Sequence, residues 1–273
     1  MRGVGTPRHL ESAILATAAQ ARSTQPRDLI AGLDKGLQVI EAFDDDQPRQ
    51  TIAQVAARCS LTRAAARRYL LTLEHLGYAS SDGKLFSLTP KVLRLGQSYM
   101  YSARLPRIVQ PELNRLAYTL KEASSAGVLD GNDVLCVAAL SVGRIVSASL
   151  QPGTRVPAYC TSNGRVLLSA LGADEPEAWL ARQTLHALTP HTHTHPQRLS
   201  AELARVRAQG YAQVDQELEL GLRTIAVPLK NARGEVLAAI NVSVNAAQVS
   251  MERLVEHCLP ALLQTQANLR VLL

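Results

Sequence analysis

One stretch, residues 50–89, constrains the fold of this 273-residue chain more than any other. It reads QTIAQVAARCSLTRAAARRYLLTLEHLGYASSDGKLFSLT. Thr51 precedes a helical pattern that runs to about Arg58, and Thr62 precedes a second one after a short turn at residues 59–61. A threonine in that place is a good N-cap, because its hydroxyl accepts an N–H that the first helical turn leaves free. The spacing predicts a helix-turn-helix.

The residues that follow add a wing to this motif. In the second helix Ala66, Leu70 and Leu73 fall at positions i, i+4 and i+7, which predicts a buried stripe. Gly77 is placed to end that helix as its C′ residue. Residues 78–88 then alternate like a β-hairpin, with Asp82-Gly83 at the tip, a pair typical of type I′ turns. Together these elements predict a winged helix-turn-helix.

The positive charge of the chain is concentrated in this stretch. Residues 47–94 contain eight Lys or Arg residues and two acidic ones, a net charge of +6, which equals the net charge of the whole chain. Residues 123–273 contain twelve residues of each sign. A basic region confined to one module is the pattern expected of a domain that contacts a phosphate backbone.

A helix entering the major groove meets base edges with its N-terminal residues. Arg63 and Arg67 lie one turn apart, and the small Ala64 between them permits close approach. The predicted contacts to double-stranded DNA come from the helix starts, the second helix and the wing tip: Thr51, Thr62, Arg63, Ala64, Arg67, Arg68 and Lys84. The alternative interpretation is a small helical bundle with a solvated arginine face.

Composition excludes several other classes. Aromatic residues make up 4% of the chain, too few for base stacking on single-stranded nucleic acid. The four cysteines (Cys59, Cys136, Cys160 and Cys258) show no CxxC spacing, which indicates reduced thiols in a cytoplasmic protein. No apolar run approaches the length of a membrane span. We expect no cofactor.

Two segments allow more than one interpretation. Residues 1–27 combine glycine, proline and a weak alanine-rich pattern, and we expect a flexible extension. The tract His191-Thr192-His193-Thr194-His195 has the alternating histidines of some metal-binding loops, but such tracts are more often plain polar loops. We therefore expect no metal site.

The other elements follow from hydrophobic periodicity. Residues 33–43 predict a first helix with Leu33, Leu37, Ile40 and Phe43 on its buried face. A linker helix is expected over residues 90–104, apolar on more than one side and suited to dimerisation, and a further helix starts at Pro106. Strands are predicted at 125–129, 134–139, 145–150, 224–229 and 236–244, and helices at 162–171, 176–185, 197–209 and 250–273, the last interrupted near Pro260. This order predicts an α+β protein.

Two long motifs resemble the IclR family of bacterial transcription regulators. LDKGLQVIEAF with TIAQVAARCSLTRAAARRYLLTLEHLGY is similar to the family's winged-helix module, and GYAQVDQELELGLRTIAVPLKNARGEVLAAINVSV resembles its C-terminal signature. The resemblance covers residues 28–273. It implies a DNA-binding dimer, often a tetramer, whose GAF-like α/β domain binds a small organic acid. The implied domains are a DNA-binding domain at 28–89, the linker at 90–104 and an effector-binding domain at 105–273.

A narrower resemblance concerns residues 134–171. VLCVAALSVGRIVSASLQPGTRVPAYCTSNGRVLLSAL is similar to the regulators of protocatechuate, p-hydroxybenzoate and β-ketoadipate catabolism. Asn163 stands where that subgroup has methionine, and Ser141-Val142-Gly143-Arg144 replaces its usual Pro-Thr-Arg-Arg. We expect one of those acids, or a related one, as the effector.

The effector site is predicted from polar residues in apolar surroundings. The segment 158–164 supplies hydroxyl groups and opens a helix, whose N-terminus attracts anions; simple capping by Thr161 or Ser162 is the alternative. Asn241 and Ser243 share one face of a strand by its period of two. The predicted effector-binding residues are Thr161, Ser162, Asn163, Gly164, Asp215, Thr224, Asn241 and Ser243. Arg144, Arg155 and Arg223 are either partners of a carboxylate or surface residues.

Two other functions compete with an effector-responsive regulator. An enzyme would use Asp215, Glu217 or Cys160, but the chain has no nucleophile elbow, P-loop, GxGxxG or HExxH motif, and we expect no enzymatic activity. A constitutive DNA-binding protein would use its second domain only to form oligomers. Polar residues inside apolar strands favour a ligand site instead.

Overall fold

The computed structural model describes residues 29–44, 46–142, 150–172 and 175–273. Contacts within the chain divide it into two compact units, residues 29–102 and residues 103–273 of the described part. We call them the N-terminal unit and the C-terminal unit. The predicted extension at 1–27, nearly all of the strand predicted at 145–150, and Gly143-Arg144 lie outside the described residues.

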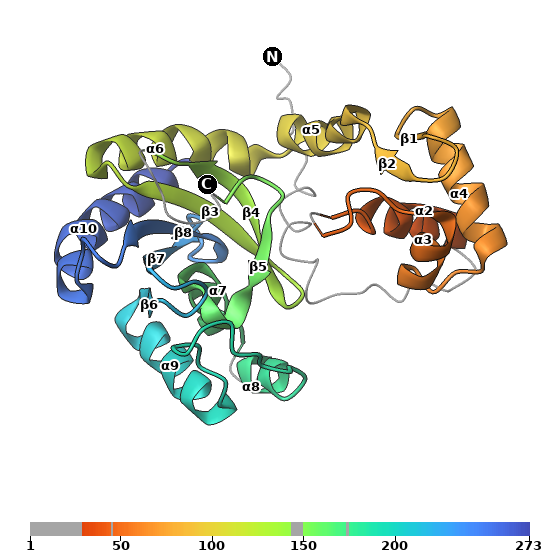
Figure 1. The fold of residues 1–273 in the computed structure, drawn as a ribbon. Helices are drawn as coiled ribbons and strands as arrows, with labels where there is room; N and C mark the ends of the chain where they lie inside the picture. Colours follow the sequence, from red (N-terminus) through yellow and green to blue (C-terminus); the bar gives the residue numbers. More distant parts are fainter. Residues whose placement is uncertain (1–28, 45, 143–149, 173–174) are drawn as a thin grey trace, which may run out of the picture. The chain divides into compact units, whose positions relative to one another are not determined.

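The N-terminal unit is a winged helix-turn-helix, as predicted. Its helices are α2 (Ala31–Glu41), α3 (Ile52–Arg58) and α4 (Arg63–His75), followed by the wing strands β1 (Ala79–Ser81) and β2 (Phe86–Leu88) (Figure 1). Thr51 caps α3 and Thr62 caps α4, each accepting a backbone N–H three residues on. Gly77 follows the last turn of α4 with φ of +77°, a conformation that favours glycine.

The core of this unit confirms the stripe on α4 and corrects the face of α2. Ala66 and Leu70 are fully buried, whereas Leu33 and Leu37 are 62% and 46% exposed. The buried residue of α2 is Val39, with Ile40 and Phe43 half-buried around it. Two apolar faces lie side by side on α2, and packing against α4 selects the one that contains Val39.

The wing turn also differs from its prediction. Type I′ requires positive φ at both central residues, but Gly83 has φ of +96° and Asp82 does not. Four residues, 82–85, connect the strands. The Asp82 carboxylate accepts the N–H groups of Lys84 (3.0 Å) and Leu85 (2.8 Å), and this closes the longer loop.

The linker consists of a short 3-10 helix, η3 (Pro90–Val92), and α5 (Leu93–Ser102), in which no residue is buried. The predicted helix 90–104 is therefore too long, because Ala103 has extended backbone (φ −78°, ψ 126°) and separates α5 from α6 (Arg104–Leu120). The start predicted at Pro106 falls inside α6.

The described part of the C-terminal unit is built on six antiparallel strands. They are β3 (Ala123–Asp130), β4 (Asp133–Leu140), β5 (Arg155–Pro157), β6 (Ala212–Asp215), β7 (Leu222–Lys230) and β8 (Val236–Asn245). Their order in the sheet is β5-β4-β3-β8-β7-β6. The chain thus returns so that β3 pairs with β8 at the centre, and β3 and β8 carry the residues on which the site below depends.

Helices cover both faces of this sheet (Figure 1). On one face α6 and α10 (Met251–Arg270) enclose a core that includes Leu113, Ile240 and Leu262. On the other face a second core surrounds α7 (Ser162–Ser169) and α9 (Pro196–Gln209), preceded by η4 (Ala158–Cys160) and flanked by α8 (Glu175–Leu180). The α+β prediction is confirmed.

Several boundaries were predicted wrongly. Strands β5 and β6 have three and four residues, too short for a periodic pattern to be visible in sequence. Helix α10 runs through Pro260 without interruption, because the proline is exposed and its neighbours Cys258 and Leu262 are buried. Helix α7 ends at Ser169 rather than 171, and α8 ends at Leu180 rather than 185.

Candidate functional site

The exposed face of α4 carries the predicted DNA contacts. Arg63, Ala64, Arg67 and Arg68 are all exposed. Within the described part of the chain, no carboxylate pairs with any of the three arginines. Lys84 is exposed in the wing loop, and its side chain likewise has no partner among the described residues. These cations are therefore available for an external anion.

Other basic residues of this unit serve its own structure. Arg49 binds Asp82 of the wing at 2.5 Å, and Arg58 pairs with Asp44. Lys91 donates to the Leu76 carbonyl at 2.6 Å and lies over the Tyr78 ring. This separates structural cations from those that face solvent on α4 and the wing.

Thr51 and Thr62 are engaged as helix caps. The Thr51 hydroxyl accepts the Gln54 N–H at 3.3 Å and donates to the Gln54 side chain at 2.8 Å. The Thr62 hydroxyl accepts the Ala65 N–H at 3.2 Å. Their established role in the structure is to fix the N-termini of α3 and α4.

In the C-terminal unit a cavity lies between the N-terminus of α7 and the sheet. It is narrow, with an accessible volume of about 30 Å³, and it is partly open to solvent. Its apolar wall includes Val134, Val156, Val214, Leu218 and Leu222. No lysine or arginine of the described residues lines it. Among the described residues, the donors available to an anion bound here are therefore uncharged.

The first two residues of α7 bring such donors to the cavity. Ser162 and Asn163 are 1% and 5% exposed, and both line it. The Ser162 Oγ and the Asn163 Oδ1 have no hydrogen-bond partner in the described structure. Their backbone N–H groups stand at the positive end of the helix dipole. Buried polar atoms without partners are rare in folded proteins, so this end of the cavity is suited to a polar ligand.

The sheet supplies a second polar group. Ser125 on β3 donates its hydroxyl to Asn241 Oδ1 on β8 at 2.6 Å, and Asn241 Nδ2 donates to Ser243 Oγ at 3.3 Å. Thr224 on β7 stands opposite Ser243 in the strand register. All four side chains line the cavity, together with Thr161, the N-cap of α7. Ser125 was missed by the sequence analysis, because two adjacent serines, Ser124 and Ser125, give no periodic signal that tells which of them faces the cavity.

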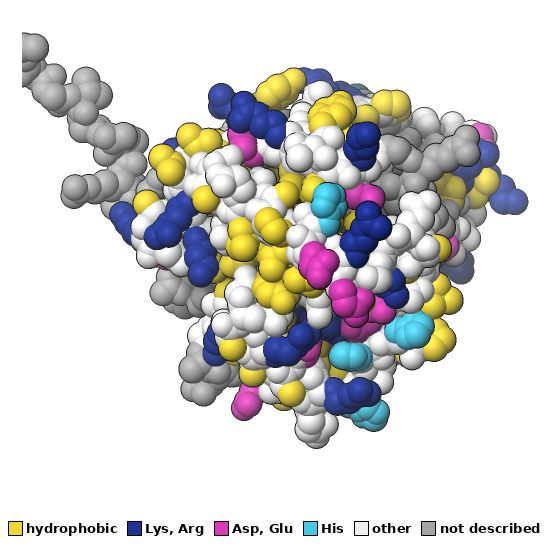
Figure 2. All heavy atoms as spheres, turned by 90° about the vertical axis from the view of Figure 1, so that its left-hand side faces the viewer, with side chains coloured by type: hydrophobic (Ala, Val, Ile, Leu, Met, Phe, Trp, Pro, Cys, Tyr) yellow, Lys and Arg dark blue, Asp and Glu magenta, His cyan; other side chains and the backbone are white. Residues whose placement is uncertain are grey.

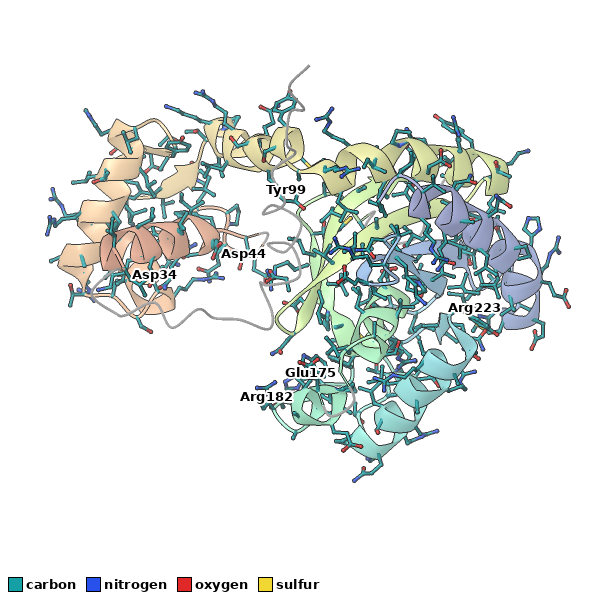
Figure 3. All side chains as sticks on the ribbon, turned by 180° about the vertical axis from the view of Figure 1, so that it is seen from behind. Asp34, Asp44, Tyr99, Glu175, Arg182 and Arg223 are labelled. Atoms are coloured by element: carbon teal, nitrogen blue, oxygen red, sulfur yellow. The ribbon has the colours of Figure 1, made fainter. Side chains whose placement is uncertain are left out.

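Gly164 and Asp215 are not among the described residues that line the cavity. A Cβ atom at Gly164 would lie 2.1 Å from the Ala158 carbonyl oxygen, so this glycine lets α7 pack directly against η4. Asp215 binds Arg223 at 2.7 Å, and this guanidinium keeps the pKa of the carboxyl low. Figure 3 labels Arg223, which also donates to the carbonyls of Ala246 and Val249. We drop both residues from the candidate site.

Helix α7 is fixed by ion pairs and hydrogen bonds that sequence reasoning missed. Arg165 is 1% exposed and donates to Glu217 at 2.6 Å and to the Tyr159 carbonyl at 3.0 Å. At the other end, Arg207 of α9 donates to the carbonyls of Ser169 (2.7 Å) and Leu171 (3.0 Å). An arginine inside the apolar run NGRVLLSAL was the available signal, since a buried arginine requires a carboxylate.

Glu217 also organises the histidine tract. Its carboxylate accepts the His193 N–H at 3.0 Å, and its backbone carbonyl accepts the Thr192 hydroxyl at 2.7 Å. Burial lowers the pKa of His193, against the opposing effect of Glu217. Within the described ranges no three His, Cys, Asp or Glu residues are placed to hold a metal ion. The tract packs as part of the wall behind α7.

The two cysteine thiols that line the cavity are not activated as nucleophiles. Burial raises the pKa of Cys160 to about 12 and that of Cys136 to about 11. Both thiols therefore remain neutral near pH 7, where the thiolate is the nucleophile. Asp215 and Glu217, the carboxylates that an enzyme was expected to use, are both engaged in ion pairs with arginines of the fold.

A second hollow lies beside α8 and is lined by Glu175, the first residue of α8, and by Arg182, which follows the helix (Figure 3). It is wider and more open than the cavity. None of the unpartnered buried atoms of the described structure belongs to it. The cavity at α7 is therefore the better candidate for a specific ligand.

Charge on the C-terminal unit is mixed. On the face seen in Figure 2, Lys and Arg side chains lie next to Asp and Glu. Arg155 pairs with Asp130 and Asp133, which accounts for one of the arginines considered as a ligand.

Of the helices that the structure describes, none has the length and hydrophobicity to span a membrane.

Comparison with known proteins agrees with these two units. Residues 32–83 match the IclR helix-turn-helix domain, and residues 97–270 match the C-terminal domain of IclR bacterial transcriptional regulators. The chain is 45% identical to the Pca regulon regulatory protein of Pseudomonas putida, over 93% of this chain and 87% of that one. It is 39% identical to the p-hydroxybenzoate hydroxylase transcriptional activator of Acinetobacter baylyi, over 94% and 96% of the two chains.

Solved structures give the same assignment. A transcriptional regulator from Rhodococcus sp. RHA1 has a TM-score of 0.78 at 44% identity, covering 89% of this chain and 97% of that one. An IclR homolog from Microbacterium hydrocarbonoxydans, complexed with 4-hydroxybenzoate, has a TM-score of 0.73 at 25% identity, with 88% and 97% covered. The inducer-binding domain of PobR from Acinetobacter, a double mutant complexed with 3-hydroxybenzoic acid, has a TM-score of 0.59 at 35% identity, with 63% and 100% covered. The chain belongs to the IclR family of bacterial transcriptional regulators, and it binds DNA through its helix-turn-helix.

Proposed function

We propose that the chain regulates an operon for the catabolism of an aromatic or other organic acid in the cytoplasm. In this proposal it binds operator DNA as a homodimer or homotetramer and responds to a small carboxylic acid bound in the cavity at α7. Protocatechuate, p-hydroxybenzoate and β-ketoadipate are the first candidates. Relatives named for the pca genes and for p-hydroxybenzoate hydroxylase, and two relatives solved with hydroxybenzoates, support this class.

The observation that carries the proposal is the pair of unpartnered side chains at the start of α7. Ser162 and Asn163 are buried and line the cavity, and the Ser162 hydroxyl, which can donate, has no partner in the described structure. The unpartnered atom of Asn163 is Oδ1, which can only accept, so Asn163 would donate to a carboxylate through Nδ2. A carboxylate accepts hydrogen bonds from a hydroxyl, an amide and the N–H groups of a helix N-terminus. The apolar wall of valines and leucines suits an aromatic ring.

Two neighbouring serines of β3 provide a matched test. Ser125 faces the cavity and bonds Asn241, whereas Ser124 faces the other side and donates to the Leu113 carbonyl at 3.1 Å. Each alanine variant removes one buried hydroxyl and is expected to cost about 1 kcal/mol of stability. Only Ser125→Ala is expected to weaken effector binding, about tenfold, because only this variant removes a hydroxyl of the cavity lining and one of the two donors to Asn241 Oδ1.

The measurement is a thermal-shift screen of aromatic and aliphatic acids, followed by calorimetric titration. A ligand that binds only the folded state raises the melting temperature. Equal loss of affinity in Ser124→Ala and Ser125→Ala would assign the effect to stability rather than to the site. If no acid shifted the wild-type protein, the proposed effector class would be wrong.

The DNA-binding half is tested on α4. Arg63→Ala and Arg67→Ala are each expected to cost roughly 1–3 kcal/mol of operator binding if they contact bases. Arg253→Ala, an exposed arginine at the start of α10 in the C-terminal unit, is the control and should leave affinity unchanged. Gel-shift titrations at fixed salt measure all three. Full affinity in both α4 variants would remove this helix face from the interface.

A further inference from the structure

The cavity has two polar ends, and the strand register gives their separation. At one end, a Cβ atom built on Gly127 would lie 3.5 Å from Asn163 Nδ2, so the start of α7 lies over Gly127. Gly127 pairs with Ala239 of β8. Ser243, at the other end, lies four residues further along β8, which is about 13 Å at the usual rise of a strand. Less the reach of the side chains, this separation is close to the length of one substituted ring.

We call the end of the cavity at Ser243 the sheet end. The direction of its hydrogen bonds follows from Asn241. Its Oδ1 accepts the backbone N–H of Ser125 at 3.2 Å, and a backbone N–H can only donate. This fixes the amide orientation, so it is Nδ2 that faces Ser243 Oγ, at 3.3 Å. Ser243 therefore uses its oxygen as an acceptor. Its own proton is left to donate to another group.

Thr224 completes this end. It is buried on β7 and pairs with Ser243 across the strands, on the side that lines the cavity. In the part of the chain that the structure describes, the Thr224 hydroxyl has no hydrogen-bond partner. Ser243 thus offers a donor, and Thr224 beside it offers a hydroxyl that can donate or accept.

We propose that the sheet end recognises an uncharged oxygen of the effector, on the side of the effector opposite the carboxylate that α7 holds. Ser243 is then the specificity-determining residue. The inference rests on the proposed function, because it assumes a carboxylate at α7. A phenolic hydroxyl para to the carboxylate matches both groups, since it accepts from Ser243 and donates to Thr224. A second ionised carboxylate matches less well, because the described residues place two hydroxyls and no cation beside its charge.

Three ligands test the proposal by calorimetric titration: 4-hydroxybenzoate, 4-methylbenzoate, which has nearly the same shape, and benzoate, which lacks the para group. The wild-type protein is expected to bind 4-hydroxybenzoate at least tenfold more tightly than 4-methylbenzoate, because the methyl group leaves the hydroxyls of Ser243 and Thr224 unpaired. In Ser243→Ala this ratio is expected to fall to about twofold, while the affinity for 4-methylbenzoate is unchanged or higher. Thr224→Val, which keeps the shape of the side chain, is expected to reduce the same ratio.

Ser124→Ala is the control and should retain the wild-type ratio, since Ser124 faces away from the cavity. Because each ratio is measured within one variant, a general loss of stability cancels from it. An unchanged ratio in Ser243→Ala would overturn the inference and leave the proposed function intact. The inference would also be overturned if the wild-type protein bound β-ketoadipate more tightly than 4-hydroxybenzoate and bound 4-hydroxybenzoate no more tightly than 4-methylbenzoate. If none of these acids bound the wild-type protein, both proposals would fail.

Discussion

Glu217→Ala is expected to lower the free energy of unfolding of the C-terminal unit by about 3–5 kcal/mol, the largest effect we anticipate for any single side chain. The Arg165 side chain is 1% exposed and has its short contact to Glu217, at 2.6 Å. The next carboxylate, Glu202, lies 4.0 Å away. Removing Glu217 therefore leaves a buried guanidinium with incomplete compensation, and the His193 N–H loses its acceptor.

Denaturant unfolding monitored in the purified protein measures this loss. Glu219→Ala is the matched control, because Glu219 is two residues away and its side chain has no partner among the described residues; its expected change is within about 0.5 kcal/mol. The double variant Arg165→Met with Glu217→Leu should regain much of the stability, since neither charge is then buried alone. A loss below 1 kcal/mol in Glu217→Ala would contradict our account of the pair.

Gly164→Ala is expected to have the second-largest effect, on stability and on effector binding together. The new Cβ would lie 2.1 Å from the oxygen and 2.4 Å from the Cα of Ala158, both backbone atoms that a rotamer change cannot move. Overpacking of this kind costs typically 1–3 kcal/mol or more. Relief requires α7 to shift, and its first residues are the proposed carboxylate donors, so effector affinity should fall by about tenfold or more.

Gly36→Ala in α2 is the control for a helical glycine. Its Cβ would meet the Tyr69 ring at 3.9 Å, an ordinary contact, and the change should stabilise α2 by up to about 1 kcal/mol. Thermal unfolding and effector titration on both variants separate the two cases. If Gly164→Ala bound the effector as tightly as the wild-type protein, the position of α7 would not matter for binding.

The sequence predicted the N-terminal unit in more detail than the C-terminal one, for a physical reason. Capping by Thr51 and Thr62 and the ending of α4 at Gly77 are local signals, each set by a few neighbouring residues. The exposed face of α2 was predicted wrongly because two apolar faces compete and only packing decides between them. The wing turn was predicted wrongly because the Asp82 side chain closes a longer loop than its dipeptide suggested.

In the candidate site, too, contacts between residues far apart in the chain could not be predicted from the sequence. Asn241 and Ser243 were recognised because period two places them on one face of β8. Ser125 bonds Asn241 across 116 positions of the chain, and Arg165 bonds Glu217 across 52. Neither pairing is visible without the fold. Asp215 was predicted as a site residue because of its charge, but in the structure its carboxylate forms an ion pair with Arg223.

Three contacts that hold α7 have an evolutionary consequence, because none of the residues in these three contacts lines the cavity. Gly164 against Ala158, Arg165 with Glu217, and Arg207 on the last carbonyls hold the helix from outside the binding surface. Side chains that face the ligand, such as Asn163 and Ser243, can therefore be exchanged without weakening the frame that positions them. A lineage can in this way acquire a response to a new acid by one or two substitutions, and laboratory selection for new inducers should find its useful changes in the lining rather than in these three contacts.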